Sequence, residues 1–380
     1  MYEQIREDTL FIILYTVVTT MAVLASCYLL LRRGNAIAPD IVPPVRLRRW
    51  TAAFFASIAL NHIWYMPIMF LASSDDILMT DLVGGMLDTI TVIPLAIVVL
   101  LTMLQDRRRP LWPVAVLMAP LVVVGLHSVV NRSYALLPVM YAYFLLMGIG
   151  LTIYMVRAVR QYGRWLRDNY ADLEHKEVWQ GFVVLVIMLL VFGLYTYIYE
   201  GTVYLYALLV GFAVLVCYLL WRVETLSDLS IPPLQSQPVA GSSATDGETV
   251  EDDALSQATH DRIGALLKKH CIDTQLYLQH DLSIAQLAKA IGTNRFYLSQ
   301  YFSTQGITYN AYVNDLRIHH FKRLYREAVA EGRPFTARQL AGESGYHSYS
   351  TFRLAFKQRM GQNVREWMHA MTQNSQEQQK

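Results

Sequence analysis

The residues of this 380-residue chain that are best suited to chemistry lie in two short segments of its last third. In each segment large apolar residues stand four positions apart, Leu298 with Phe302 and Phe352 with Phe356, which predicts two helices with one buried face each. The residues off these faces offer hydrogen-bonding groups, aromatic rings and positive charge, which suit contacts to the bases and phosphates of DNA. We expect such contacts from Arg295, Phe296, Ser299, Gln300, Tyr349, Ser350, Arg353 and Lys357.

The three basic residues in this set fit two roles. Arg295 and Arg353 have the geometry to bind the edge of a guanine, but they equally suit phosphate contacts, which position a protein without selecting a sequence. Lys357 fits a phosphate better than a base. Because a phosphate contact lowers affinity for every sequence and makes the salt dependence shallower, a salt titration separates the two roles.

Each of these helices is preceded by a short helix and a glycine turn. Ala288 lets the first pair of helices approach closely, Gly292 suits a turn with positive φ, and Asn294 is a good N-cap for the second helix. Ala341 and Gly345 repeat the spacing of Ala288 and Gly292, and the Phe352/Phe356 pair lies one residue further from its glycine. Residues 309–330 between the two units predict one long connecting helix, with Arg317 among the residues expected to supply surface charge.

The stretch 282–367 resembles the AraC-type DNA-binding domain. The matching segments are LAKAIGTNRFYLSQYF, the bridging YVNDLRIHHFKRL, and QLAGESGYHSYSTFRLAFKQRMG. This resemblance implies two helix-turn-helix units whose second helices enter successive major-groove segments of double-stranded DNA. The chain departs from the family at Val364, where proline is usual, and at Leu354, where a polar or basic residue is common. The second unit is therefore expected to select sequence weakly, or to contact thymine methyl groups.

The rest of the chain has the composition of a membrane protein. Hydrophobic residues make up 54% of the sequence and charged residues 16%, and the apolar runs show almost none of the polar faces of a soluble bundle. About 20 apolar residues cross a bilayer as a helix. We expect an all-α protein with seven spans, at about 10–31, 50–71, 82–104, 111–130, 134–156, 178–199 and 201–221.

The loop charges predict the orientation of these spans. One set of loops holds 14 basic residues, from Arg32 to Arg222, whereas the opposite set holds only Arg6 and Arg132 beside several acids. Because basic loops stay in the cytoplasm, the N-terminus is expected outside and the C-terminal domain inside, at the cytoplasmic membrane of a bacterium. This argument does not use the C-terminal domain, yet it places that domain where DNA is.

Three polar residues at membrane depth form the candidate signal or ligand site: Asn61, His62 and Asp88. Such residues are costly in a bilayer, so they are functional candidates; the alternative is hydrogen bonding between helices, and Asp88 could equally lie near the outer interface with access to water. Pro67 and Pro94 are expected to kink the second and third spans.

The predicted domain order is a membrane domain at 1–223, an acidic disordered linker at 224–257, the DNA-binding domain at 258–373 and a disordered tail at 374–380. Residues 224–257 hold seven acids and no base, with many Pro, Ser and Gly, whereas residues 258–370 hold 15 Lys/Arg against eight Asp/Glu. A flexible linker of this length transmits orientation poorly, so dimerisation in the membrane or local concentration is the expected form of control.

These features predict a one-component transcription regulator that senses an extracytoplasmic or membrane signal, and not an enzyme. The alternatives are a transporter or membrane enzyme with a fused autoregulatory domain, and a DNA-binding protein with an inert anchor. No cofactor is expected, and the cysteines and histidines lack the spacing of metal ligands. The partners that fit are double-stranded DNA, the lipid bilayer, a second copy in a homodimer, RNA polymerase for an activator, and a signal ligand whose identity is not encoded.

Overall fold

The computed structural model describes residues 8–32, 34–39, 41–70, 73–183, 202–229 and 252–377, and its regular elements there are all helices. The chain divides into two compact units. Unit 1 comprises residues 1–162 and 175–236, and unit 2 comprises residues 163–174 and 237–380. The short segment 163–174, which precedes the rest of unit 2 by more than 60 residues, was not expected in the C-terminal domain.

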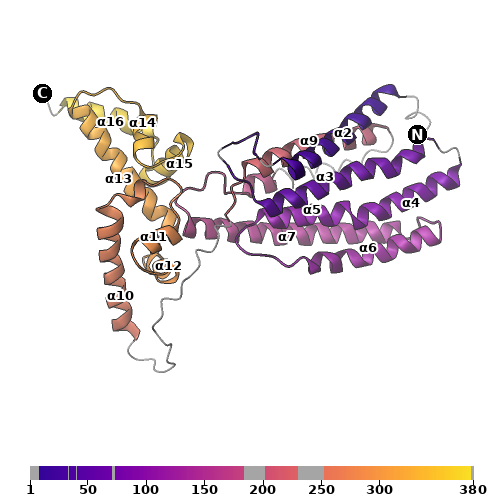
Figure 1. The fold of residues 1–380 in the computed structure, drawn as a ribbon, viewed down its shortest axis with the longest axis horizontal. Coiled ribbons are helices and arrows are strands. Elements are labelled where there is room, and N and C mark those ends of the chain that lie inside the picture. Colours follow the sequence, from indigo (N-terminus) through magenta and orange to yellow (C-terminus); the bar gives the residue numbers. More distant parts are fainter. Residues whose placement is uncertain are drawn as a thin grey trace. The chain divides into compact units, whose positions relative to one another are not determined.

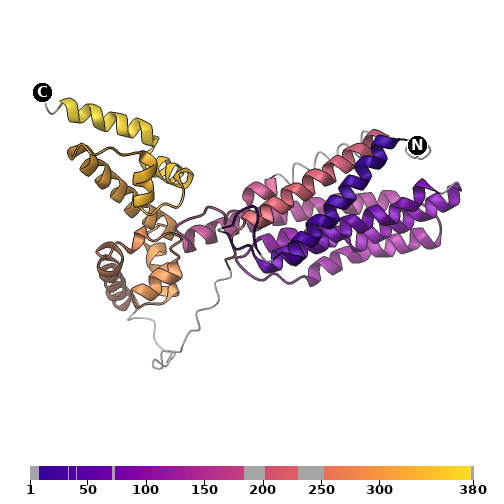
Figure 2. The same ribbon diagram turned by 45° about the horizontal axis from the view of Figure 1, so that its top comes forward.

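Unit 1 is a bundle of long helices that lie side by side in both ribbon views (Figures 1 and 2). Helix α2 packs against α3 and α9, α3 packs against α5, and α4 packs against α6. The helices are α2 (Thr9–Leu31), α3 (Val45–Tyr65), α4 (Ser74–Ile90), α5 (Val92–Met103), α6 (Trp112–Val130), α7 (Leu137–Asn169) and α9 (Thr202–Thr225). The last residues of α7, from Gly163 on, belong to unit 2.

Five helical stretches of the described residues are long and apolar enough to cross a membrane: Thr9–Leu31, Ser74–Met103, Trp112–Val130, Leu137–Asn169 and Leu205–Thr225. They coincide with five of the seven predicted spans. Helix α3 covers most of the predicted span 50–71 but is not among the five, and its first turns carry Arg46, Arg48 and Arg49. Most of the predicted span 178–199 lies outside the described residues, so the count of seven stays a prediction.

Two helix irregularities occur beside the prolines that were expected to cause them. The third predicted span begins earlier than expected, at Ser74, and is interrupted at Thr91 between α4 and α5. Pro94 has no N–H for the carbonyl of Ile90, and its ring crowds that carbonyl, so the helix breaks one turn before the proline. Helix α3 gives way to a 3-10 turn (η1, Met66–Met69) that contains Pro67.

The two ends of unit 1 differ in chemistry. At one end the buried carboxylate of Glu224 pairs with Arg48 at 3.3 Å and accepts a hydrogen bond from Tyr28 at 3.0 Å, and the Asn35 side chain donates to the Glu224 carbonyl at 2.6 Å. At the other end Tyr206 donates to Asp8, and Arg132 pairs with Asp75. The first end holds Arg46, Arg48, Arg49 and Arg107 to Arg109, and the second holds mainly acids.

Unit 2 contains eight named α-helices or short helical turns of the C-terminal third. They are α10 (Asp252–Leu267), a π-helical turn η2 (Lys268–Ile272), η3 (Leu276–Leu278), α11 (Ile284–Ala290), α12 (Arg295–Thr304), α13 (Tyr309–Ala330), α14 (Ala337–Glu343) and α15 (Tyr349–Met360). With α16 (Val364–Glu377), which follows them, the described part of the C-terminal third has nine such elements. The short pairs α11/α12 and α14/α15 flank the long helix α13, as the repeated sequence pattern predicted.

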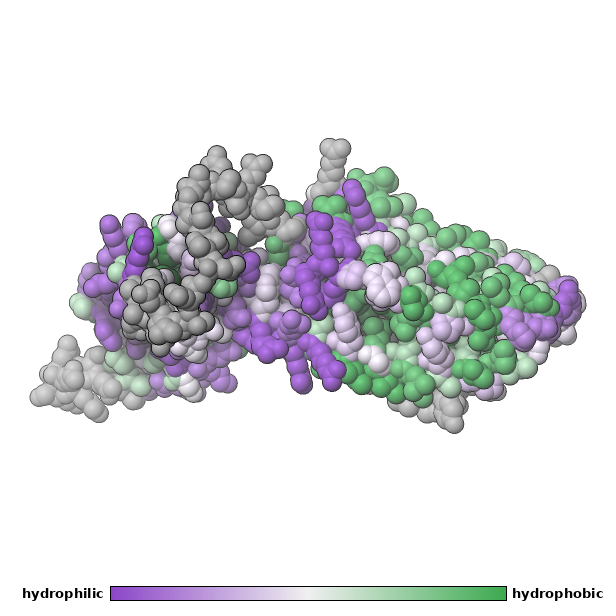
Figure 3. Space-filling model, turned by 90° about the horizontal axis from the view of Figure 1, so that it is seen from below, coloured by the Kyte–Doolittle hydropathy of each residue, from purple (hydrophilic) through white to green (hydrophobic). Residues whose placement is uncertain are grey.

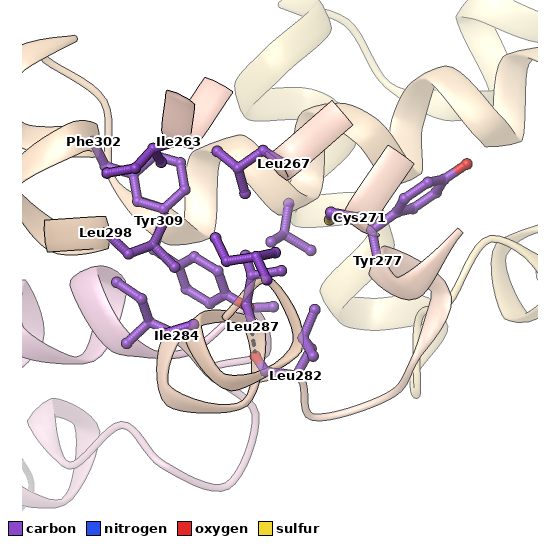
Figure 4. Packing of buried hydrophobic residues seen from close by; sticks show 14 residues of the cluster. Ile263, Leu267, Cys271, Tyr277, Leu282, Ile284, Leu287, Leu298, Phe302 and Tyr309 are labelled. Atoms are coloured by element: carbon purple, nitrogen blue, oxygen red, sulfur yellow. Dashed lines mark hydrogen bonds between the residues drawn. The ribbon is translucent and has the colours of Figure 1, made fainter. Parts of the chain in front are cut away.

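Unit 2 has one apolar core around each pair of short helices. Ile263 and Leu267 of α10 pack with Leu298 and Phe302 of α12 in the first core, so α10 belongs to this part of the fold (Figure 4). Cys271 lies fully buried in the same core, and burial raises the pKa of its thiol to about 11, so it packs as a neutral side chain. The second core gathers Phe321 of α13, Phe352 and Phe356 of α15, and Trp367 of α16.

The structure corrects several details of the sequence analysis. Arg317, expected on the surface of the connecting helix, is completely buried because its guanidinium has acceptors on every side. The ends of the predicted disordered linker are helical, since α9 continues to Thr225 and α10 starts at Asp252, while residues 230–251 lie outside the described residues. The predicted disordered tail also begins too early, because α16 continues to Glu377.

Candidate DNA-binding surface

The turn inside each short helix pair has the same backbone geometry. In the first turn Gly292 has φ +73°, its N–H donates to the Lys289 carbonyl at 3.2 Å, and the Thr293 N–H donates to the Ala288 carbonyl at 2.9 Å. In the second turn Gly345 has φ +88°, its N–H donates to Gly342, and the Tyr346 N–H donates to Ala341. Both are Schellman turns, which end a helix with a residue in the left-handed region.

Side-chain caps fix where the second helix of each pair begins. The Asn294 side chain accepts a hydrogen bond from the Tyr297 N–H at 2.9 Å, as the sequence predicted, and starts α12. Ser348 accepts from the Thr351 N–H at 3.2 Å and starts α15. The first helix of each pair is also capped, by Ser283 and Thr336. The same order of cap, short helix, glycine turn, cap and longer helix therefore occurs twice.

The four residues expected to contact DNA in the first pair are all exposed on α12. Arg295, Phe296, Ser299 and Gln300 are at the surface, while Leu298 and Phe302 of the same helix are buried. Phe296 is 70% exposed, although an aromatic ring gains from burial. The helix therefore presents a polar and aromatic face outward and uses its apolar stripe to join the first core.

In the second pair Ser350, Arg353 and Lys357 are exposed on α15, whereas Tyr349 is half-buried against Phe352 and lies beside the Arg338 guanidinium. The exposure of Tyr349 is thus smaller than that of the other seven residues. Leu354, which the sequence singled out as unusual, is 62% exposed next to Arg353. The outward face of α15 consequently combines positive charge with one exposed apolar side chain.

Val364 also has a structural account. It is the first residue of α16 and is buried in the second core, at a position where proline would be tolerated because the first N–H of a helix needs no partner inside it. Asn363 and Glu366 form reciprocal hydrogen bonds of 2.9 and 3.2 Å between their side chains and backbone N–H groups. This capping box starts α16 without the usual proline.

The candidate signal site in unit 1 is brought together only in part. Asn61 of α3 donates to the Asp88 carboxylate of α4 at 2.7 Å, so these two residues form a polar contact between helices. His62 is buried on another side of α3, where its ring packs on Tyr15 at 4.8 Å and on Phe212 at 5.8 Å, and its Nδ1 contacts the Ile58 carbonyl. His62 therefore belongs to the contact of α3 with α2 and α9. Among the described residues, no group of three His, Cys, Asp or Glu side chains is arranged to hold a metal ion.

Comparison with known protein families gives a match for the region just described. Residues 287–370 match the family model of a helix-turn-helix domain, and the match covers α12 to α15 with most of α11 and the first half of α16. A comparison with curated proteins and with solved structures finds no match. The family match, the capped turns and the exposed polar helix faces lead to one conclusion: residues 287–370 are a helix-turn-helix domain of the AraC type, which supports a DNA-binding role in transcription regulation.

Proposed function

We propose that the chain is a membrane-anchored, sequence-specific transcription regulator that acts as a one-component sensor, with α12 and α15 as its two DNA-contacting helices. The observation that carries this proposal is the presence, on one chain, of a helix-turn-helix domain and, among the described residues, of five helical stretches with membrane-spanning length and apolarity. The two helix pairs would place α12 and α15 in successive major-groove segments.

The surface of unit 1 supports the membrane anchor. Apolar side chains cover much of the face of its helices seen in Figure 3, and the most apolar window of α7 is almost entirely unburied within the structure. More than half of each of these side chains is exposed: Leu10, Leu24, Leu31, Val123, Leu145 and Leu146. Exposure of these apolar side chains to water would cost much free energy, and a bilayer would remove that cost by covering them.

The unequal ends of unit 1 support the proposed orientation. Basic residues gather at the end that holds the buried Glu224, and acids gather at the end that holds Asp8 and Asp75. The positive-inside rule assigns the first end to the cytoplasm. A signal from outside or from within the bilayer would then act on α3 and α4, whose Asn61–Asp88 contact is the polar junction between them.

Genome-wide mapping of the sites that the full-length chain occupies in its host tests this function. We expect a limited set of sites that share one motif with two half-elements, and recovery of the chain in the membrane fraction. The matched control is a chain with both Gln300→Ala and Arg353→Ala, which removes two exposed candidate contacts and leaves the buried stripes intact. Occupancy without a shared motif, or occupancy unchanged in the control, would overturn the proposal.

A further inference from the structure

The segment Tyr170, Ala171, Asp172, Leu173 and Glu174, which we call the strap, is built into unit 2. It follows α7 directly, and its contacts in the C-terminal third lie between Asp281 and Thr351. Chain connectivity therefore joins unit 2 to unit 1 at three places: before Gly163, after Glu174 and before Gln237. The long linker is only one of these.

Main-chain hydrogen bonds hold the first residues of the strap. Tyr170 and Ser283 form an antiparallel bridge, and the Ala171 N–H donates to the Leu282 carbonyl at 3.1 Å. The Asn310 side chain on α13 donates to the carbonyls of both Tyr170 and Ala171. Ala171 is buried in the first apolar core, so this part of the strap contributes apolar packing as well as main-chain hydrogen bonds.

A buried ion pair anchors the strap to α13. The Asp172 carboxylate accepts hydrogen bonds from Arg317 Nη1 at 2.9 Å and from the Asp281 N–H at 3.0 Å. The Asp172 side chain is 3% exposed and the Arg317 side chain 0%. The same guanidinium donates to the Tyr277 carbonyl at 2.7 Å and to the Gln279 carbonyl at 2.8 Å. Asp172 supplies the negative charge that makes a fully buried arginine tolerable, since an unpaired charge in the interior is strongly unfavourable.

The strap also reaches the second helix pair. The Thr351 hydroxyl on α15 donates to the Glu174 carboxylate at 2.8 Å. Within five residues the strap thus contacts the first pair at Leu282 and Ser283, the connecting helix at Asn310 and Arg317, and the second pair at Thr351. A domain with two DNA-contacting helices needs a fixed spacing between them, and the strap bridges all three parts that set this spacing.

We propose that the surface formed by Leu282, Ser283, Asn310, Arg317 and Thr351 is a peptide-binding surface whose partner is the chain's own strap, and that docking of the strap is required for high-affinity DNA binding. The part of this inference that concerns DNA affinity rests on the proposed function. Because the strap follows α7, the docked contact gives the membrane half a direct means of control. A displacement of α7 that withdraws Asp172 leaves Arg317 unpaired and loosens the spacing of α12 and α15.

Hydrogen exchange of the full-length protein in lipid nanodiscs tests the docking itself, without any use of DNA. We expect Asp172→Asn to speed exchange in peptides covering 277–283, because the charge that orders Arg317 and the Asp281 N–H is removed. Asp168→Asn is the matched control, since it removes the same charge from an exposed position on the last turn of α7. Equal exchange in the wild type and in Asp172→Asn would overturn the docking, whether or not the chain binds DNA.

DNA affinity tests the consequence of docking, with a duplex taken from the mapped sites. Removal of an acid should strengthen DNA binding by simple electrostatics, so Asp168→Asn is expected to bind equally or slightly more tightly. Asp172→Asn is expected to bind about tenfold more weakly, in the usual range for coupling between two sites. Glu174→Gln, which removes the charge from the part-buried contact with Thr351 and leaves the Asp172–Arg317 pair intact, should show a smaller loss. A wild-type affinity in Asp172→Asn would overturn the requirement.

A peptide in trans separates a docking role from simple misfolding. A synthetic peptide of residues 163–177 is added at high concentration to the Asp172→Asn protein, which should recover slow exchange at 277–283 and DNA affinity. The same peptide with Asn at position 172 is the control and should restore neither. If neither peptide restores exchange or affinity, the surface does not bind the strap as a separable partner, and the proposal fails.

Discussion

Gly345 lies so close to Leu278 that a Cβ atom added to the glycine would stand 2.8 Å from the Leu278 Cα and from its carbonyl oxygen. Gly345 belongs to the turn between α14 and α15, and Leu278 ends the short helical turn η3. This contact brings the second helix pair against the backbone that Arg317 also holds. The turn between α14 and α15 therefore packs directly against η3, the segment that precedes α11 and α12.

The glycines of the two turns should therefore respond differently to the same substitution. Gly292→Ala carries the cost of positive φ alone, about 1–2 kcal/mol, because no atom beyond the adjoining residues lies within 4 Å of the added methyl group. Gly345→Ala carries the same cost and a clash with rigid backbone, for a total of roughly 2–5 kcal/mol. Native-state hydrogen exchange of the slowest amides of unit 2 in the full-length protein gives both free energies of unfolding. Equal losses for the two variants would contradict the role of the Leu278 contact.

The local features of the DNA-binding part were accessible from the sequence because they depend on neighbours in the chain. Gly292 and Gly345 indicated turns, Asn294 indicated a cap, and the spacing of Phe352 and Phe356 indicated a buried stripe. Each of these signals arises within one or two helical turns, where residue type restricts backbone and burial directly.

The contacts of the strap could not be predicted from such local patterns. Asp172 and Arg317 are 145 positions apart; Arg317 was expected at the surface of its helix, and no sequence signal pointed to Asp172. Their burial results from three-dimensional packing that no local pattern encodes. The count of seven spans stays a prediction, since α3 carries arginines in its first turns and is not among the five sufficiently apolar stretches of the described residues.

The exposed basic residue Lys357 and the neutral residue Gln300 should affect DNA binding in different ways. Lys357→Ala is expected to weaken binding to all sequences and to reduce the slope of log K against log salt by about 1, as for a lost phosphate contact. Gln300→Ala is expected to relax the preference at one base pair, at a cost of about 1–3 kcal/mol, and to leave the slope unchanged. Fluorescence anisotropy over a salt series, with operator and mismatched duplexes, measures both.

Arg359→Ala is the matched control for Lys357→Ala. Both remove one exposed positive charge from α15, but Arg359 is paired with Asp315 at 2.6 Å, so its charge is already largely neutralised. A decrease in the salt slope equal to that of Lys357→Ala would show that net charge, and not contact by Lys357, governs the effect.

His320 should make the stability of unit 2 depend on pH. Its Nδ1 lies 2.9 Å from the Tyr277 hydroxyl and 3.2 Å from the Arg323 guanidinium. Burial and the Arg323 charge lower the pKa of the imidazole, and the carboxylates of Glu327 and Glu343 raise it by less. Below pH about 6.5 the His320 imidazole is protonated in the unfolded chain but stays neutral in the folded chain, because its pKa is lower there. Stability is therefore complete above that pH and falls as the solution is acidified toward the folded-state pKa.

Hydrogen exchange of unit 2 at pH values between 7.5 and 5.5, corrected for the intrinsic rate, measures this loss. His320→Gln should be less stable at neutral pH, because the Tyr277 contact changes, but should lose part of the pH dependence. His319→Gln is the neighbouring control, since His319 is largely exposed on the same helix. A pH dependence that disappears in His319→Gln and persists in His320→Gln would contradict the assignment.

The Asn61–Asp88 contact should couple α3 to α4 energetically. We expect a double-mutant cycle with Asn61→Leu and Asp88→Leu to give a coupling free energy of about 0.6–2 kcal/mol, the range of hydrogen bonds between helices in membranes. Thermal unfolding of the purified protein in detergent provides the four values. His62→Phe is the control: the ring lies on another side of α3, so its effect should add to that of Asp88→Leu without coupling.

If the contact also senses the signal, the Asp88→Leu chain should occupy its mapped sites at normal protein levels but no longer change the transcription of its target genes when the host's growth conditions change. A response equal to that of the wild type would leave the pair a purely structural role.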